Sequence, residues 1–194
     1  MSIPKQTGEI FELLNKGQFI CSNSANPWIS KLYDIIDDQD NFNSLYEYFS
    51  GINFILEKGD EYYYFSRKNE SRADVERKLE SALKWIDIVD FLKTFDNSFG
   101  TGYSFSPSSI SVGISVDAVL KNKADSVRNI LRIDEKAPYT EVVGKIADML
   151  CKDGFMEIEN EIHNSYKVLS SFKFLEELID IINISDEKID EISE

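Results

Sequence analysis

The sequence predicts an α+β protein that is predominantly helical. Two segments rich in β-forming residues, 51–66 and 154–170, each lie between helical patterns. Elsewhere, most hydrophobic residues recur at the three- and four-residue spacing of amphipathic helices. Hydrophobic residues make up 42% of the 194 residues, which is enough for a packed core.

The segment 51–66 is predicted to form a tight β-hairpin. Phe54 and Leu56 alternate with polar neighbours, and Tyr62–Phe65 is a run of residues that favour strands. Gly59 lies in the turn between them, where glycine tolerates a positive φ. A helical pattern precedes the hairpin and a long charged helix follows it. A hairpin between helices in this order is the arrangement of a winged helix.

The same order of elements occurs twice in the chain. The first hairpin begins at Gly51 and the second at Gly154, and each glycine also ends a helical pattern. Each hairpin has two strands around a polar turn and leads into another helix, after Ser66 and after Ser170. Because helix, helix, hairpin and helix recur in this order, the sequence predicts tandem winged-helix domains.

The chain is predicted to divide into two domains, a connection and a tail. The N-terminal winged-helix domain covers residues 1–98 and ends in the long helix, and the C-terminal one covers residues 116–184. Residues 99–115 are rich in glycine and serine, which interrupt helical patterns, and form an ordered connection. The acidic tail, residues 185–194, is either a frayed end or a docking segment.

The long helix after the first hairpin has one apolar stripe and one charged face. The stripe consists of Val75, Leu79, Ala82, Leu83, Ile86, Val89 and Leu92. Such a stripe is typical of a helix that spans two subdomains or lies in an interface. It is equally typical of a single helix that faces a core, so both interpretations stay open.

The net charge of the chain is strongly negative, with 35 Asp and Glu against 21 Lys and Arg, a formal charge of −14. Free nucleic acid is repelled on average by such a chain, so contact with it needs a local basic patch or a basic partner. The charge either serves solubility alone or marks a functional acidic face. A secretory signal pattern and an apolar run of membrane-spanning length are both missing, so we expect a cytoplasmic protein.

The sequence offers no catalytic signature. Phosphate-binding glycine loops, the HExxH zinc motif and the GxSxG nucleophile motif are absent. The single histidine, His163, lies in the polar turn of the second hairpin, and Cys21 and Cys151 lack the spacing of metal ligands. Two reduced thiols are favoured over a disulfide or a metal site. We therefore expect no enzyme activity, no catalytic residue, no cofactor and no metal.

The charges favour protein binding over DNA binding. Residues 43–49, the helix before the first hairpin, contain no Lys or Arg, and both hairpins are rich in Glu, whereas a helix and wing that bind DNA need a basic surface. Tyr62–Tyr64 and Trp85 are candidate apolar anchors for a partner protein. Two milder basic groups, around 67–72 and 121–132, are either solvated or make weak contacts with the DNA backbone. The possible partner or DNA contacts are Tyr63, Arg67, Lys68, Arg72, Arg128 and Arg132.

Three patterns of apolar and aromatic residues lie in about the first 70 residues. They are Ile10-Phe11-x-Leu13-Leu14-x-x-Gly17-x-Phe19-Ile20, Tyr48-Phe49-x-Gly51-Ile52-x-Phe54-x-Leu56 and Tyr62-Tyr63-Tyr64-Phe65-Ser66-Arg67. This combination resembles the MukE/MksE group of bacterial condensin subunits. The resemblance implies a dimeric, non-enzymatic tandem winged-helix subunit that binds a kleisin of the MksF or MukF type and, through it, an SMC-type ATPase. It also implies a role in chromosome organisation or plasmid defence, with DNA contacted weakly or only within the complex.

The leading hypothesis from the sequence is therefore a kleisin-binding accessory subunit of a bacterial SMC/condensin-like complex. The alternative is a winged-helix DNA-binding transcriptional regulator, which would use the same fold with its basic groups on phosphate. An enzyme of unrecognised type is a weaker third possibility.

Overall fold

The computed structural model describes residues 3–68 and 72–181, with side chains 73–75 and 77–81 left aside. We call 3–68 the N-terminal half and 72–181 the C-terminal half. The N-terminal half contains α1 (Thr7–Asn15), β1 (Ile20–Cys21), α2 (Pro27–Asp37), α3 (Gln39–Ser50), β2 (Phe54–Lys58) and β3 (Tyr62–Arg67). The C-terminal half contains α4 (Arg72–Phe95), β4 (Ser104–Phe105), α5 (Pro107–Val116), α6 (Ala118–Ile130), α7 (Tyr139–Lys152), β5 (Met156–Asn160) and β6 (Ser165–Val168). A closing helix follows over 172–181. The α+β, predominantly helical class is confirmed.

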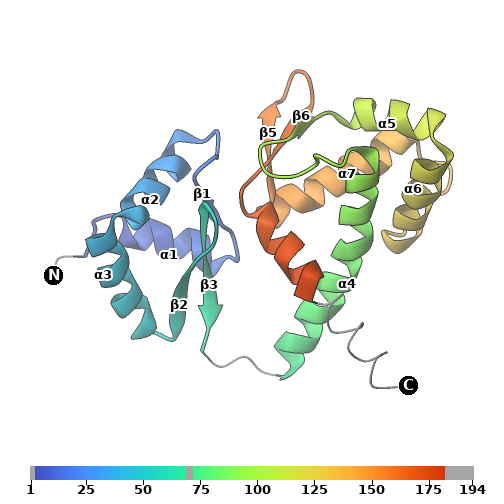
Figure 1. The fold of residues 1–194 in the computed structure, drawn as a ribbon. Coiled ribbons are helices and arrows are strands. Elements are labelled where there is room, and N and C mark those ends of the chain that lie inside the picture. The colour runs from blue at the N-terminus through green and yellow to red at the C-terminus, as the bar shows by residue number, and fades with distance from the viewer. Residues whose placement is uncertain (1–2, 69–71, 182–194) are drawn as a thin grey trace.

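The N-terminal half packs three helices against one face of a small antiparallel sheet (Figure 1). The strand order is β1-β3-β2, with Ile20 opposite Tyr63 and Leu56 opposite Phe65. Apolar side chains from all six elements form one core. Its buried members are Ile10, Leu14, Ile20, Leu32, Ile36, Leu45, Phe49, Leu56 and Tyr63.

Local hydrogen bonds explain where α2 and α3 begin. The Asn26 side chain accepts from the backbone N–H of Trp28, and Pro27 occupies the first turn, where its missing N–H costs nothing. Asp38 has an extended ψ of 125°, which ends α2, and its carboxylate accepts from the N–H groups of Asp40 and Asn41. One aspartate therefore separates the two helices and starts the second.

The first hairpin forms where it was predicted, but for a different reason at its turn. Glu61 has the positive φ, 67°, and Gly59 does not. A Cβ atom at Gly59 would lie 2.0 Å from the Tyr62 ring. Glycine is required here because the turn passes directly over this ring, and not because of its φ.

The C-terminal half has its own sheet and its own core. The strand order is β4-β6-β5, all antiparallel, with Phe105 and Ile158 both opposite Tyr166 on its two sides. Helices α4, α5, α6, α7 and 172–181 surround the apolar side chains. The buried members of this core include Trp85, Ile88, Phe91, Leu92, Phe99, Ile110, Ile114, Val127, Val143, Ile146, Leu150, Phe155, Val168 and Phe172.

Residues 99–115, predicted as an ordered connection, contain β4 and most of α5. The α5 helix begins at Ser106, whose hydroxyl accepts from the N–H of Ser109, and continues with Pro107 in the first turn. Ile110 and Ile114 are buried in the C-terminal core. This segment is therefore part of the C-terminal core.

The large buried side chains of α4 face that same core. Trp85, Val89 and Leu92 are buried in it, and α4 packs along α6. Leu83, predicted in the apolar stripe, is exposed. Val75 and Leu79 lie outside the described side chains, so the first part of the predicted stripe is not tested. The division into domains at residue 98 stays a prediction.

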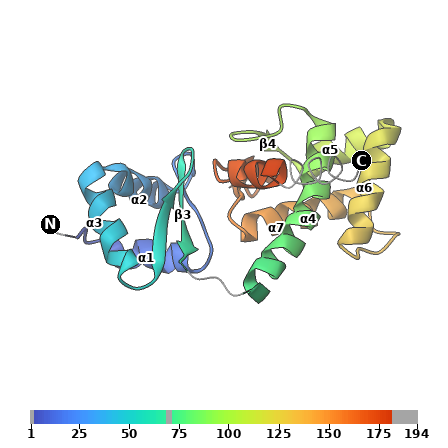
Figure 2. The ribbon, with the colours of Figure 1, turned by 60° about the horizontal axis from the view of Figure 1, so that its bottom comes forward.

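The two halves lie side by side, with the closing helix between the N-terminal half and α4 (Figures 1 and 2). The turns of the first hairpin and of the β1–α2 loop are directed toward the C-terminal half. In the part of the chain that is described, no helix has both the length and the apolar character of a membrane span.

Candidate partner-binding surfaces

An aromatic cluster joins the two halves. Phe19 of the N-terminal half lies with its ring centroid 5.2 Å from that of Phe155 and 5.6 Å from that of Phe174. Tyr64 lies 5.2 Å from Phe174 in an edge-on arrangement. Such edge and tilted pairs add to the free energy of area burial. The halves therefore share an apolar interface.

The polar contacts of this interface converge on Asn23, in the β1–α2 loop. Its side-chain oxygen accepts from the backbone N–H of Ser170 at 2.9 Å, and its amide donates to the carbonyl of Val168 at 3.2 Å. The ammonium of Lys167 donates to the Asn23 carbonyl at 2.7 Å. One loop residue thus bonds both β6 and the start of the closing helix.

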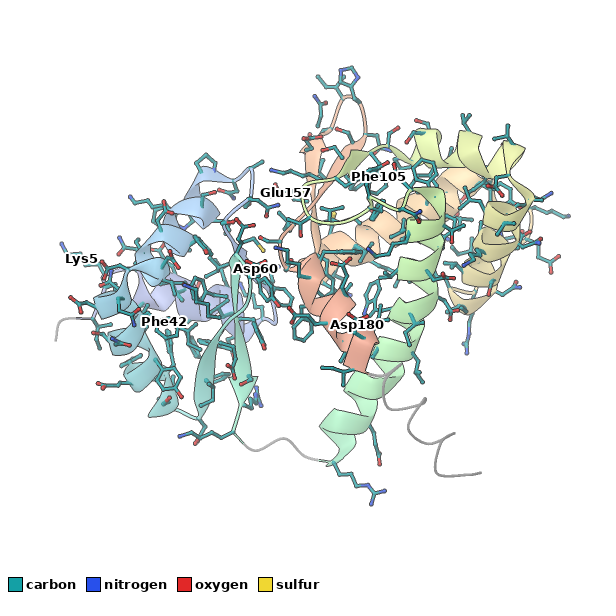
Figure 3. The ribbon with its side chains drawn as sticks, viewed as in Figure 1. Lys5, Phe42, Asp60, Phe105, Glu157 and Asp180 are labelled. Atoms are coloured by element: carbon teal, nitrogen blue, oxygen red, sulfur yellow. The ribbon has the colours of Figure 1, made fainter. Side chains whose placement is uncertain are left out.

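The turn of the first hairpin is part of this interface. Asp60 forms an ion pair with Lys173, and the Glu61 carbonyl is 2.8 Å from the Ser170 hydroxyl. Figure 3 shows Asp60 at the boundary between the halves. The turn therefore contacts the C-terminal half, while the Asp60 side chain stays 68% exposed.

A cavity of about 310 Å³ lies between the halves, and both cysteines line it. Glu157 contributes to its wall and accepts hydrogen bonds from the Ser24 hydroxyl and the Ala25 N–H. Cys21 and Cys151 are free thiols on the same wall. Burial raises the pKa of the Cys21 thiol, and burial raises the pKa of Cys151 to about 11. Both thiols are therefore neutral at pH 7, whereas nucleophilic chemistry needs the charged thiolate.

The exposed side chains of α3 are distributed around the helix outside its buried side, with Tyr46 and Tyr48 on opposite sides of Glu47. Tyr46, Glu47 and Tyr48 are exposed, and Gln39–Ser50 contains no Lys or Arg. Phe42, half-buried, stacks at 6.2 Å on Tyr46. We call Phe42, Tyr46, Glu47 and Tyr48 the α3 face. It lacks the positive charge that phosphate contacts require.

Two aromatic residues predicted as partner anchors belong to the core instead. Tyr63 is only 1% exposed, and its hydroxyl donates to the Asp37 carboxylate at 2.7 Å. Trp85 is buried beside Phe155, with ring centroids 5.9 Å apart. In a strand, alternate side chains point to opposite faces, and the β3 register directs Tyr63 inward. Neither side chain is accessible to a partner in this structure.

The basic residues around the end of β3 are exposed but do not form one charged patch. The Arg67 guanidinium lies over the Phe54 ring, 5.3 Å from its centroid. Lys68 is exposed. Arg72 pairs with Glu76 at 2.9 Å, one turn along α4. Each exposed pair of this kind contributes little free energy. A role for these three residues in binding stays a prediction.

The two arginines of the α6 region do not share a helix face, because α6 ends at Ile130. The Arg128 side chain is 11% exposed, pairs with Asp125 at 3.0 Å and donates to the Ala137 carbonyl at 3.1 Å. Its guanidinium also lies 4.5 Å from the centroid of the Tyr139 ring. Arg132 lies beyond the end of α6 with a positive φ of 52°. Arg128 therefore fixes the α6–α7 loop, and only Arg132 is exposed.

The turn of the second hairpin extends away from the body of the molecule (Figure 1). It carries exposed Glu159, Glu161, Ile162 and His163, and the His163 N–H donates to the Asn160 side chain at 3.0 Å. Among the residues that the structure describes, no cluster of three or more His, Cys, Asp and Glu could hold a metal ion.

Residues 5–179 match the family model of the condensin complex protein MksE. The chain belongs to this family. No curated protein matches the chain. The resemblance to the MukE/MksE group is thereby confirmed.

The match to the MksE family covers nearly all of the described chain. The match extends over both halves, including β4, α5 and the second hairpin, whereas the sequence patterns quoted above cover only the first 70 residues. The chain is accordingly a condensin-associated protein. A DNA-binding regulator is not favoured by this family.

Proposed function

We propose that the chain is a non-enzymatic accessory subunit of a bacterial SMC/condensin-like complex. It binds the kleisin subunit, of the MksF or MukF type, and through it an SMC-type ATPase. The single observation that carries the proposal is the MksE family match over residues 5–179. The complex would act in the cytoplasm, on the nucleoid, in chromosome organisation or plasmid defence.

We further propose that each half is a winged helix. In the N-terminal half the order is helix, strand, two helices and a two-stranded hairpin. The C-terminal half repeats this order with one additional helix before its hairpin, and the strand orders β1-β3-β2 and β4-β6-β5 correspond. Because the described core side chains of α4 belong to the C-terminal core, we place the domain boundary near residues 68–72 and not at 98.

The α3 face is the surface that we propose for the kleisin. In a winged helix that binds DNA, the corresponding helix enters the major groove and must meet phosphate charge. Here Tyr46 and Tyr48 are exposed around Glu47, and tyrosine is enriched at the centres of protein interfaces. An aromatic surface without cations is better suited to a protein segment than to a nucleic acid.

The test is titration of the purified chain with the purified kleisin-type protein that we expect to be encoded beside it. We expect a complex with a Kd in the micromolar range or tighter. The double variant Tyr46→Ala/Tyr48→Ala should weaken it at least tenfold, which corresponds to about 1.4 kcal/mol. A matched control, Val112→Ala/Val119→Ala, removes two exposed apolar side chains of α5 and α6 and should leave the affinity unchanged.

The outcomes separate the two parts of the proposal. No complex at micromolar concentration would exclude the kleisin-binding function. A complex that tolerates the double tyrosine variant would exclude the α3 face alone. We also propose a homodimer, to be measured by light scattering, and weak contact with DNA or contact only within the complex. Salt-dependent duplex binding by the isolated chain would instead favour a DNA-binding regulator.

A further inference from the structure

The turn of the second hairpin concentrates negative charge, and the one Lys of the hairpin, Lys167 in β6, is bonded to the Asn23 carbonyl. From Asp153 to Tyr166, both included, there are four Asp and Glu, one His and no Lys or Arg. Glu159 is 3.2 Å from the hydroxyl of Ser104, its closest hydrogen-bond donor. Within the described residues, no ion pair involves a carboxylate of this hairpin. Its charge is therefore available to an external cation.

The same hairpin exposes two isoleucines near its turn. Ile162 is 90% exposed, more than any other large hydrophobic residue in the described part of the chain, and Ile158 is 52% exposed. Exposed apolar area in a fixed position is characteristic of interaction sites. We call Ile158, Glu159, Glu161 and Ile162 the second tip.

The backbone around the second tip has a defined geometry. The β5–β6 ladder pairs Asn160 with Ser165, directly before and after the turn. The Asn160 side chain accepts from the His163 N–H at 3.0 Å, and Asn164 adopts a left-handed φ of 47°, which asparagine tolerates. A surface that is already ordered loses less conformational entropy when it binds.

The first hairpin shows how an acidic turn of this kind docks within the same chain. Its Asp60 carboxylate pairs with Lys173, and its turn lies beside the apolar contacts of Tyr64 and Phe174. The first turn thus combines a cation on the receiving surface with adjacent apolar packing. The second turn carries the same kinds of groups but has no receiving surface among residues 3–68 and 72–181.

We propose that the second tip docks into an apolar pocket rimmed by Lys or Arg on a partner protein. Ile162 fills the pocket, and Glu159 and Glu161 pair with the cationic rim. DNA would be repelled by these carboxylates, and a second copy of the chain carries the same net charge of −14. The proposal rests on the chain being a subunit of a protein complex, and it does not require that this partner be the kleisin.

The test is site-specific photo-crosslinking in cells that contain the native partners of the chain. A benzophenone amino acid replaces Ile162. In a control variant the same amino acid replaces Ile52, which is exposed in the N-terminal half. We expect one protein adduct from position 162, attached to a peptide of the partner that contains Lys or Arg. Glu159→Lys/Glu161→Lys should lower its yield at least fivefold. Glu12→Lys/Glu135→Lys, at two exposed acids elsewhere, should not.

The other possible results either overturn the docking proposal or separate it from the proposed function. The proposal is wrong if position 162 gives no protein adduct, an adduct with a second copy or a nuclease-sensitive adduct with DNA. A protein adduct whose yield is insensitive to charge reversal overturns it as well. An adduct with a protein that is neither a kleisin nor an SMC subunit supports the second tip but counts against the proposed function. A complex with the kleisin but no adduct at position 162 supports the proposed function and counts against the second tip.

Discussion

Replacing Asn23 by alanine tests the interface between the halves most directly. Asn23 bonds the backbone N–H of Ser170 at 2.9 Å and the Val168 carbonyl at 3.2 Å, and lies 3.0 Å from the Ser170 hydroxyl. Ser170 is 0% exposed. A buried N–H that loses its acceptor has no access to water in its place.

The expected cost follows from which groups lose their only partner. The Val168 carbonyl still accepts from the Gly102 N–H at 2.9 Å, and the Ser170 hydroxyl can donate to the Glu61 carbonyl at 2.8 Å. Only the Ser170 N–H is left without an acceptor, which costs about 1–3 kcal/mol. Asn23→Asp keeps the accepting oxygen but places a second acceptor against the Val168 carbonyl, so it should also destabilise the interface.

Urea unfolding followed by tryptophan fluorescence can measure this cost in each half. Trp28 lies in α2 and Trp85 in the C-terminal core, so variants with one tryptophan report on one half each. The comparison needs a fixed protein concentration, because self-association changes apparent stability. We expect Asn23→Ala to lower the free energy of unfolding and to separate the transitions of the two halves.

The control is Asn43→Ala, which truncates an exposed asparagine of α3. It should change the free energy of unfolding by less than about 0.5 kcal/mol. If Asn23→Ala matches this control, the hydrogen-bond account of the interface is refuted.

Three further predictions concern single residues. Lys58 and then Tyr63 hold the pKa of Asp37 below its usual value, so Tyr63→Phe should raise that pKa, as NMR titration can measure. A carboxyl with a lowered pKa stabilises the fold only while it is ionised. Tyr63→Phe should therefore lower the free energy of unfolding by about 1 kcal/mol at pH 7. This difference should shrink as the pH falls through the folded pKa of Asp37. A loss that is constant with pH would contradict this. Arg128→Ala should cost about 1–3 kcal/mol in thermal or urea unfolding, and Arg128→Lys should restore less than half, because only the guanidinium can serve Asp125 and the Ala137 carbonyl together; full rescue by lysine would show that charge alone matters. Gly154→Ala should destabilise by about 1–2 kcal/mol because φ is +79°, whereas Gly144→Ala, with open space for a Cβ in α7, should stabilise by about 0.5–1 kcal/mol; equal effects of the two substitutions would refute the backbone argument.

Features set by local patterns could be predicted from the sequence. Both hairpins form close to their predicted positions, because strand propensity and a turn lie within a few neighbouring residues. The α5 helix was missed, although Ser106 and Pro107 are typical of a helix start. Gly113 and the many serines argued against a helix, and burial of Ile110 and Ile114 overcame their weak propensity.

Features set by contacts between distant segments could not be predicted. Arg128 looked like an exposed cation, but its burial depends on the carbonyl of Ala137 and the ring of Tyr139 across a loop. The interface depends on Asn23 meeting Ser170, 147 positions later. No periodicity or spacing in the sequence indicates this contact. The contact between the first hairpin's turn and the C-terminal half could therefore not be predicted either.

The aromatic interface has a consequence for synthesis of the chain on the ribosome. Tyr64 lies against Phe174, which is translated 110 residues later. At about 5–20 residues per second, that interval lasts roughly 5–20 s. The N-terminal half can fold its own core during this time, but Tyr64 and the neighbouring Phe19 stay uncovered. A nascent chain therefore exposes an aggregation-prone aromatic surface. Slowed translation should increase the dependence of the chain on chaperones.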